Sequence, residues 1–264
     1  MLRSLYILLV YLSFLGMGTL APFVFSLGYV WVDLFRPQQV AYIILPSIPV
    51  TMIMGALAFG AYFLMDRRAP PRLNLTLILT LLWGGWITIT TIFLAVAPEA
   101  AWMKWDWAVK TVLFSAFIPF VIRSRVQIEA FLQVYLFALC IHILPTGLKT
   151  MISGGGYGRE LGVVGGNTGF GEGSTLATTS IMMIPIIVWL MRHNVLMPRL
   201  KLVRLMYIGL AVVALACTVG TYARTGLVGM MVVGAVMWFR SERKVLFSFV
   251  IMAGLALVDR KSVV

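Results

Sequence analysis

The sequence is poor in charge, in acidic residues, in histidine and in cysteine. Only 11% of its 264 residues are charged, whereas soluble domains carry about 25%. It has nine acidic residues against 21 basic ones, two histidines and two cysteines. Because Cys140 and Cys217 fall inside apolar runs, neither a disulfide framework nor a cysteine zinc site is expected. The scarcity of charge excludes an ordinary soluble domain.

Apolar residues are abundant instead, at 61% of the chain with a mean hydropathy of +0.98. A helix that crosses a bilayer needs about 20 predominantly apolar residues. We therefore expect an all-α, polytopic membrane protein, with residues 1–264 forming a single transmembrane helix bundle. About nine transmembrane helices are expected, at residues 4–27, 40–65, 74–96, 108–122, 128–148, 174–191, 205–222, 225–239 and 245–258.

Basic residues fix the predicted orientation, because cytoplasmic loops carry an excess of Lys and Arg. Most of them lie at Arg3 and in four breaks that are separated by pairs of spans: 66–72, 123–125, 192–204 and 240–244. The N-terminus is therefore predicted to be cytoplasmic. The first apolar stretch is too long for a signal-peptide core and is expected to be a retained helix. The net charge is +12, but the basic residues lie between the spans and do not cluster on a soluble face. No nucleic-acid partner is therefore expected.

The breaks predicted on the opposite side are residues 31–39, 98–107 and 149–173, with the turn around Arg224. The second of them contains Trp102, Trp105 and Trp107. Tryptophan rings concentrate at the headgroup level of membranes, which predicts an interfacial anchor. A platform on which sugars stack is the alternative interpretation.

Arg224 stands inside the apolar run "VGTYARTGLVGMM" and lies between two predicted cytoplasmic breaks. It is therefore expected at the extracytoplasmic face. A charged side chain at the bilayer centre costs about 2.5–3.5 kcal/mol on insertion scales, so we expect Arg224 to point into a protein-lined, hydrated cavity. An arginine that snorkels from a tight hairpin is the alternative.

A glycine-rich extracytoplasmic loop is predicted at residues 149–173, and half of residues 154–173 are glycine, which excludes a regular helix. It carries Arg159, Asn167 and Glu172 on the same predicted side as Arg224. Glycine lets backbone N–H groups approach a ligand closely, and arginine binds phosphate oxygens bidentately. The nucleotide-binding motif Gly-x-x-x-x-Gly-Lys-Ser/Thr is missing. A polyprenyl diphosphate, with its tail between helices, fits this pattern; a surface loop is the alternative.

The runs "LMDRRAPP" (64–71), 86–131, the Gly/Arg loop and "GTYARTGLVGM" (220–230) together resemble the O-antigen ligase family. The likeness is greatest to the branch of O-glycosylation ligases associated with exosortase systems. The resemblance implies a multi-pass glycosyltransferase of the bacterial inner membrane. Such proteins transfer a glycan from undecaprenyl diphosphate to a lipid or protein acceptor at the periplasmic face. The carrier supplies the activation, so no cofactor and no metal is implied.

The resemblance also implies roles for particular residues. The family turn Tyr-Ser-Arg-Gly corresponds to Tyr222, Ala223, Arg224 and Thr225, so the tyrosine and the arginine match. Arg159 matches an upstream family arginine. The family's "GDNN" corresponds to residues 171–174, where Glu172 is acidic but both asparagines are missing. Arg159 and Arg224 are the implied catalytic residues, and these two with Asn167, Glu172 and Tyr222 are the implied substrate-binding residues.

The family continues with a large periplasmic loop that carries a histidine, whereas this chain ends at "LVDRKSVV". A C-terminally truncated member is therefore expected, with a tail at 259–264 that does not resemble a ligase. His142 lies inside a predicted span and His193 in a cytoplasmic loop, so topology excludes both from that role. His142 is expected to form a hydrogen bond with a neighbouring helix.

Three other functions fit parts of the sequence. An O-antigen polymerase differs from a ligase only in its acceptor. A transporter or lipid flippase would use Arg224 as a counter-charge for its substrate, although no internal repeat is visible. A non-enzymatic assembly partner for polysaccharide export would tolerate the loss of both arginines.

Overall fold

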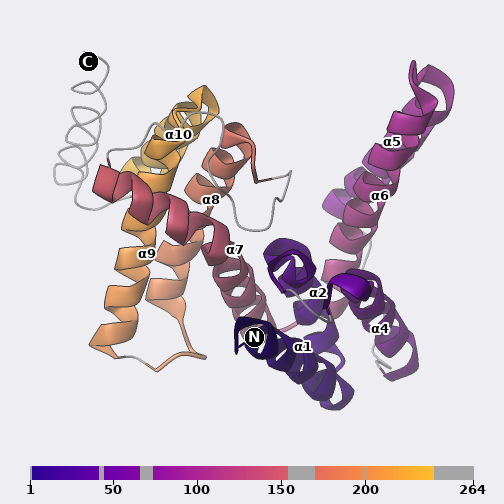
Figure 1. Cartoon of the computed structure of the whole chain (residues 1–264), viewed down its shortest axis with the longest axis horizontal. Coiled ribbons are helices and arrows are strands. Elements are labelled where there is room, and N and C mark those ends of the chain that lie inside the picture. The colour runs from indigo at the N-terminus through magenta and orange to yellow at the C-terminus, as the bar shows by residue number, and fades with distance from the viewer. Residues whose placement is uncertain (1, 42–44, 66–73, 154–169, 199, 241–264) are drawn as a thin grey trace. The chain divides into compact units, whose positions relative to one another are not determined.

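The computed structural model describes residues 2–41, 45–65, 74–153, 170–198 and 200–240, in which every regular element is a helix (Figure 1). These residues contain no β-strand. The elements are α1 (Leu2–Leu20), α2 (Phe23–Phe35), α3 (Pro37–Val40), η1 (Leu45–Ser47), α4 (Val50–Met65), α5 (Leu75–Leu94), α6 (Pro98–Val121), α7 (Arg125–Ser153), α8 (Gly173–His193), α9 (Lys201–Gly220) and α10 (Arg224–Arg240).

Five of these helices, α1, α5, α7, α8 and α9, are long and apolar enough to cross a membrane, by length and composition. Helices α2 and α4 are apolar but shorter. The all-α fold is thus confirmed for the described residues, and the five apolar helices are candidate membrane spans. The number of nine spans, the cytoplasmic N-terminus and the single transmembrane domain stay predictions. The span at 245–258 and the tail at 259–264 lie outside the described residues.

The single span predicted at residues 4–27 is wrong, because two helices meet there. Helix α1 ends at Leu20 and α2 begins at Phe23, on either side of Ala21 and Pro22. Proline has no backbone N–H, and its ring clashes with the carbonyl of residue i−4, so Pro22 disfavours continuation of α1. The backbone instead turns through hydrogen bonds from Val24 to Ala21 and from Phe25 to Pro22.

The span predicted at residues 108–122 begins too late, because α6 begins at Pro98 and includes the three tryptophans of the predicted break at 98–107. Proline is favoured at the first helical position, where its missing N–H would have no intrahelical acceptor. The indole Nε1 of Trp105 donates to Thr88 Oγ1 of α5 at 3.1 Å. The predicted ends of α8 and α10 agree with the structure to within a few residues.

The chain folds as two compact units. One contains Val10–Tyr29 and Thr51–Ile128, and aromatic rings join α2 and α4 to α6 in it. Phe59 of α4 stacks on Phe117 of α6 with ring centroids 4.1 Å apart, and Tyr29 stacks on Phe114. The outer side of α5 exposes Trp83 and Trp86, each 61% accessible, as expected for a surface that contacts lipid.

The other unit contains Met1–Leu9, Val30–Val50 and Glu129–Val264, and we call it the α7–α10 unit. Its hydrophobic core is built by α7, α8 and α9, shown in red to orange in Figure 1, with α10 packed against α8. Fully buried side chains from the three helices include Leu139, Ile187 and Tyr207. All the predicted site residues that the structure describes belong to this unit.

Candidate functional site

Glycines bring helices of the α7–α10 unit into close contact at one end. A Cβ atom added at Gly226 would lie 3.0 Å from Ala177 Cβ, and one added at Gly229 would lie 2.9 Å from Ile181 Cγ2. The contacts advance in the same direction along both helices, so α8 and α10 run parallel and their N-termini lie at the same end. Small residues permit such close approach of membrane helices.

The C-termini of α7 and α9 lie at this end too. Gly220, the last residue of α9, packs against Thr150 of α7, and Gly147 packs against Val213. Ser180 of α8 donates a hydrogen bond to Cys217 Sγ of α9 at 3.3 Å. Two helix N-termini and two helix C-termini therefore meet, and we call this region the α8/α10 N-terminal end. Sequence analysis predicts it on the extracytoplasmic side.

Arg224 is the first residue of α10, and its side chain is exposed at this end. Among the described residues it forms no hydrogen bond or ion pair. The turn before it is held by hydrogen bonds from Thr221 Oγ1 to Thr218 O at 2.8 Å and from Ala223 N to Thr221 Oγ1 at 3.3 Å. A helix N-terminus carries a partial positive charge. The guanidinium thus adds to a backbone that already favours an anion.

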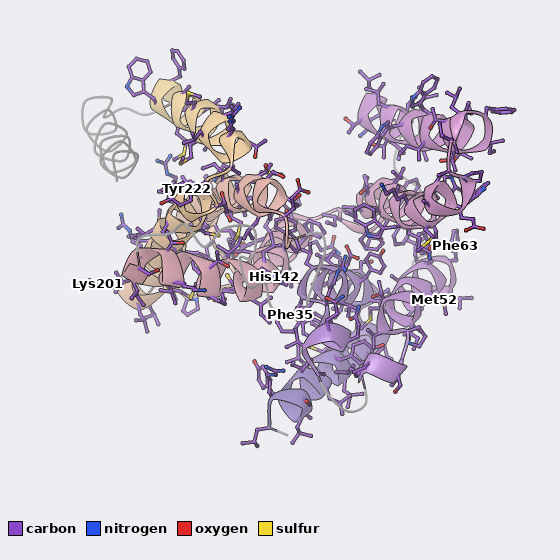
Figure 2. The ribbon with its side chains drawn as sticks, turned by 45° about the horizontal axis from the view of Figure 1, so that its top comes forward. Phe35, Met52, Phe63, His142, Lys201 and Tyr222 are labelled. Atoms are coloured by element: carbon purple, nitrogen blue, oxygen red, sulfur yellow. The ribbon has the colours of Figure 1, made fainter. Side chains whose placement is uncertain are left out.

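Tyr222 lies in that turn with φ at 50°, one of two non-glycine residues with positive φ in the described chain. Its side chain is 59% exposed (labelled in Figure 2). Such conformations are uncommon for residues other than glycine and persist where surrounding structure holds them. The left-handed residue allows α9 to end and α10 to begin within four residues.

Glu172 precedes α8 at its N-cap position and is exposed. Its Oε1 accepts a hydrogen bond from Ser174 Oγ at 2.6 Å. Glu172 and Arg224 lie at the same end of the unit, yet no ion pair joins them. Arg159 and Asn167, the other two predicted site residues, lie outside the described residues. The structure thus brings Glu172, Tyr222 and Arg224 to one end, and their proposed roles stay predictions.

Sequence analysis missed a second polar cluster in the same unit, around the end of α2. Arg36 has a left-handed backbone, with φ at 52° and ψ at 62°, and its side chain is half-buried. The dipeptide Arg36–Pro37 signals the end of a helix, because a residue before proline is disfavoured in the right-handed helical region, but it favours an extended and not a left-handed backbone. Asp33 lies one turn earlier, outside the predicted spans. Burial raises the pKa of its carboxyl, and the positive charge of Arg36 opposes that rise.

His142 of α7 belongs to this second cluster (Figure 2) and is only 1% exposed. Its Nε2 lies 3.0 Å from the carbonyl oxygen of Leu34 in α2. The expected hydrogen bond to a neighbouring helix is confirmed. Phe170 stacks on the imidazole with ring centroids 4.9 Å apart, while Nδ1 is buried without a partner among the described groups.

Glu129, near the start of α7, is a further residue that sequence analysis missed. It is fully buried, and its Oε1 accepts hydrogen bonds from Val195 N at 2.9 Å, Leu196 N at 2.8 Å and Gln133 Nε2 at 3.1 Å. Val195 N also lies 3.0 Å from Oε2. This carboxylate fastens the segment after α8 to the start of α7, at the end predicted to be cytoplasmic.

No set of three His, Cys, Asp or Glu residues within the described ranges could hold a metal ion. Residues 2–195 match the model of a family described as "Family of unknown function (DUF5935)". No curated protein and no solved structure matches the chain. The matched range includes Arg36, His142 and Glu172, whereas Tyr222 and Arg224 follow it.

Proposed function

The chain belongs to DUF5935, a family of unknown function that its residues 2–195 match, and we propose that it is a membrane glycosyltransferase resembling the O-antigen ligases. The proposed donor is a glycan on undecaprenyl diphosphate, and the proposed acceptor is a lipid or a protein. Transfer would take place at the periplasmic face of the bacterial inner membrane. The chemistry requires an anion site for the diphosphate beside an apolar surface for its tail.

The observation that carries this proposal is the position of Arg224. Its guanidinium, which has no partner among the described residues, stands at the N-terminus of α10, beside the N-terminus of α8. Arginine binds phosphate oxygens through two parallel N–H donors, and helix N-termini add backbone N–H groups and dipole. Exposed apolar side chains nearby, such as Leu227 and Met231 of α10, offer a surface for the isoprenoid tail.

In the proposed reaction, an acceptor hydroxyl oxygen attacks the anomeric carbon of the glycan from the face opposite the diphosphate. The bond between that carbon and the diphosphate oxygen breaks, and its electron pair stays on the diphosphate. The hydroxyl proton passes to a general base as the new bond forms. Arg224, with Arg159 included from the sequence alone, would stabilise the charge that grows on the leaving group. Loss of one such donor typically lowers the rate by about 10² to 10³.

The proposal is tested by binding of undecaprenyl diphosphate to the chain in lipid nanodiscs, with undecaprenol as the uncharged reference. Arg224→Ala is expected to weaken diphosphate binding by about tenfold or more, the range for a charge-assisted hydrogen bond. Arg224→Lys should retain part of the affinity. Arg240→Ala is the matched control, because Arg240 is exposed at the other end of the same helix.

Equal affinity of Arg224→Ala and the wild type would overturn the proposal, as would equal affinity for undecaprenol and the diphosphate. A transporter makes a different prediction, namely uptake of a labelled organic phosphate into liposomes without any glycan product. An assembly partner would bind the diphosphate no better than undecaprenol. A polymerase would share the Arg224 result and would differ in its product, a lengthened lipid-linked glycan.

A further inference from the structure

The end of α2 holds an arginine in a conformation that its backbone fixes. Arg36 N donates to Val32 O at 3.0 Å, and Gln39 N donates to Arg36 O at 2.9 Å, so the left-handed residue is bonded on both sides. The guanidinium is half-buried and forms no hydrogen bond or ion pair with the described residues. Such strained conformations concentrate at ligand sites.

A second, independent feature lies beside this arginine. The carbonyl of Leu34 can only accept a hydrogen bond, so the Nε2 of His142, 3.0 Å away, carries the proton. The neutral imidazole then has a lone pair on Nδ1, which is buried and has no partner among the described groups. Leu34 precedes Arg36 by two positions, so this hydrogen bond brings the imidazole close to Arg36. Buried polar atoms almost always have a partner, so Nδ1 calls for a donor from a ligand.

The two features together define the chemistry of that ligand. A lone pair on Nδ1 accepts from a hydroxyl, whereas a guanidinium donates to an anion. Phe170, whose ring lies 27° from parallel to the imidazole, covers His142 and offers an aromatic face. We infer that Arg36, His142 and Phe170 form a subsite for a sugar phosphate, with a sugar hydroxyl on Nδ1 and the phosphate on Arg36.

This subsite lies in the same unit as the α8/α10 N-terminal end. Phe170 precedes the first residue of α8 by three positions, a span of about 10 Å at most. The identification of the ligand as part of a glycan donor rests on the proposed function. Binding of a sugar phosphate by Arg36 and His142 does not depend on it.

The chain has only two histidines, so ¹⁵N labelling of the imidazoles gives two sets of resonances. In His193→Gln, the remaining set belongs to His142. The probe is a panel of hexose 1-phosphates and N-acetylhexosamine 1-phosphates, added to protein in nanodiscs, with methyl glucoside as the uncharged reference. At least one member is expected to shift the Nδ1 resonance saturably, and the methyl glucoside should bind about tenfold or more weakly.

Arg36→Asn removes the charge and keeps a residue that tolerates a left-handed backbone, so its fold should survive. It is expected to weaken sugar phosphate binding about tenfold or more, while Arg36→Lys retains part of it. Phe170→Ala should move the Nδ1 resonance toward that of a solvated imidazole without ligand. The inference is overturned if no panel member shifts Nδ1, or if Arg36→Asn binds as tightly as the wild type.

The test separates this inference from the proposed function. Arg224→Ala should leave the His142 shift unchanged while it weakens binding of undecaprenyl diphosphate. If undecaprenyl diphosphate binding does not depend on Arg224 but the Nδ1 shift depends on Arg36, the proposed function fails and the subsite stands. If binding of undecaprenyl diphosphate depends on Arg224 but the Nδ1 shift does not depend on Arg36, the subsite is wrong and the proposed function stands.

Discussion

Two buried polar side chains on α7, Glu129 and His142, are treated in opposite ways by the rest of the unit. The carboxylate of Glu129 receives backbone N–H donors from Val195 and Leu196 and the amide of Gln133. The imidazole of His142 has one hydrogen-bond partner among the described residues, the carbonyl of Leu34, and its Nδ1 is buried without one. Both side chains are at most 1% exposed, so burial alone does not separate them.

The difference shows where the polar groups of the unit are satisfied by the protein and where they remain available to a ligand. A buried charge with several donors holds two helices together and leaves nothing for a ligand. A buried nitrogen without a hydrogen-bond partner carries an unfavourable desolvation free energy, which a hydrogen bond from a ligand could offset. The predicted cytoplasmic end is thus fastened by Glu129, whereas in the opposite half the Nδ1 of His142 and the guanidinium of Arg224 form no hydrogen bond with the described residues. Substitutions can test this contrast.

The largest effect is expected from Glu129→Ala. The substitution leaves two backbone N–H groups and an amide buried without their acceptor, which typically costs about 1–3 kcal/mol for each unsatisfied group. The apparent melting temperature in nanodiscs should fall by more than for any other variant discussed. The measurement is loss of helical circular dichroism on heating.

Glu172→Ala is the matched control, because Glu172 is an exposed carboxylate at the other end of the unit. It should change the melting temperature little, since exposed polar substitutions usually lie within about 0.5 kcal/mol. Equal destabilisation by the two variants would mean that the buried hydrogen bonds of Glu129 do not stabilise its end of the unit more than Glu172 stabilises the other end.

A smaller effect is expected from Gly220→Ala, which probes how tightly α7 and α9 pack at the open end. An added Cβ would overlap Thr150, so one of the two helices must shift, and such overpacking costs about 1–3 kcal/mol. Gly209 of the same helix has no atom within 4 Å of an added Cβ. Gly209→Ala should therefore stabilise α9 slightly, by about 0.5–1 kcal/mol. Destabilisation by both variants would show that helix propensity and contact geometry do not govern α9.

The sequence predicted the later helices well, for identifiable reasons. Helices α8, α9 and α10 begin and end where glycine or charge interrupts an apolar run, and such interruptions are visible in one dimension. The break at Pro22 was missed because the flanking residues remain apolar on both sides. The start of α6 at Pro98 was missed because the charged and tryptophan residues were interpreted as an interfacial break between two spans, although they tolerate a helix at a membrane surface.

The candidate site likewise has features that the sequence predicts and contacts that it does not. The position of Arg224 at a helix start follows from its place between two apolar runs, and the turn was predicted. The partners of Glu129 lie 66 and 67 positions along the chain and are backbone groups, so no sequence pattern identifies them. Likewise, nothing in the sequence brings Leu34 to His142, 108 positions away. Contacts between distant segments required the fold.

His142→Phe is expected to change stability by about 1 kcal/mol or less, and this small effect sharpens the contrast with Glu129. The phenyl ring can keep the stack on Phe170, and removal of Nδ1 removes a buried atom without a partner. These gains offset the lost hydrogen bond to Leu34, which is worth about 1 kcal/mol. The melting temperature should stay near that of the wild type while binding of sugar phosphate is lost. A fall as large as that of Glu129→Ala would make His142 a structural residue and not part of an open subsite.

The smallest effect is expected from Asp33→Asn. The carboxyl of Asp33 is partly buried and, among the described residues, has no hydrogen-bond donors such as those that Glu129 has. Its pKa lies above the ordinary value of 3.8 through burial, opposed by the charge of Arg36. A raised pKa means that the protonated form is favoured in the folded state. The associated stability is present below pH 3.8 and is lost as the pH rises through the folded-state pKa. Asp33→Asn should therefore melt at the same temperature as the wild type in acid and at a higher temperature at neutral pH. The same difference at every pH would mean that Asp33 does not ionise against a cost, and Arg36→Asn should widen the gap because it removes the opposing charge.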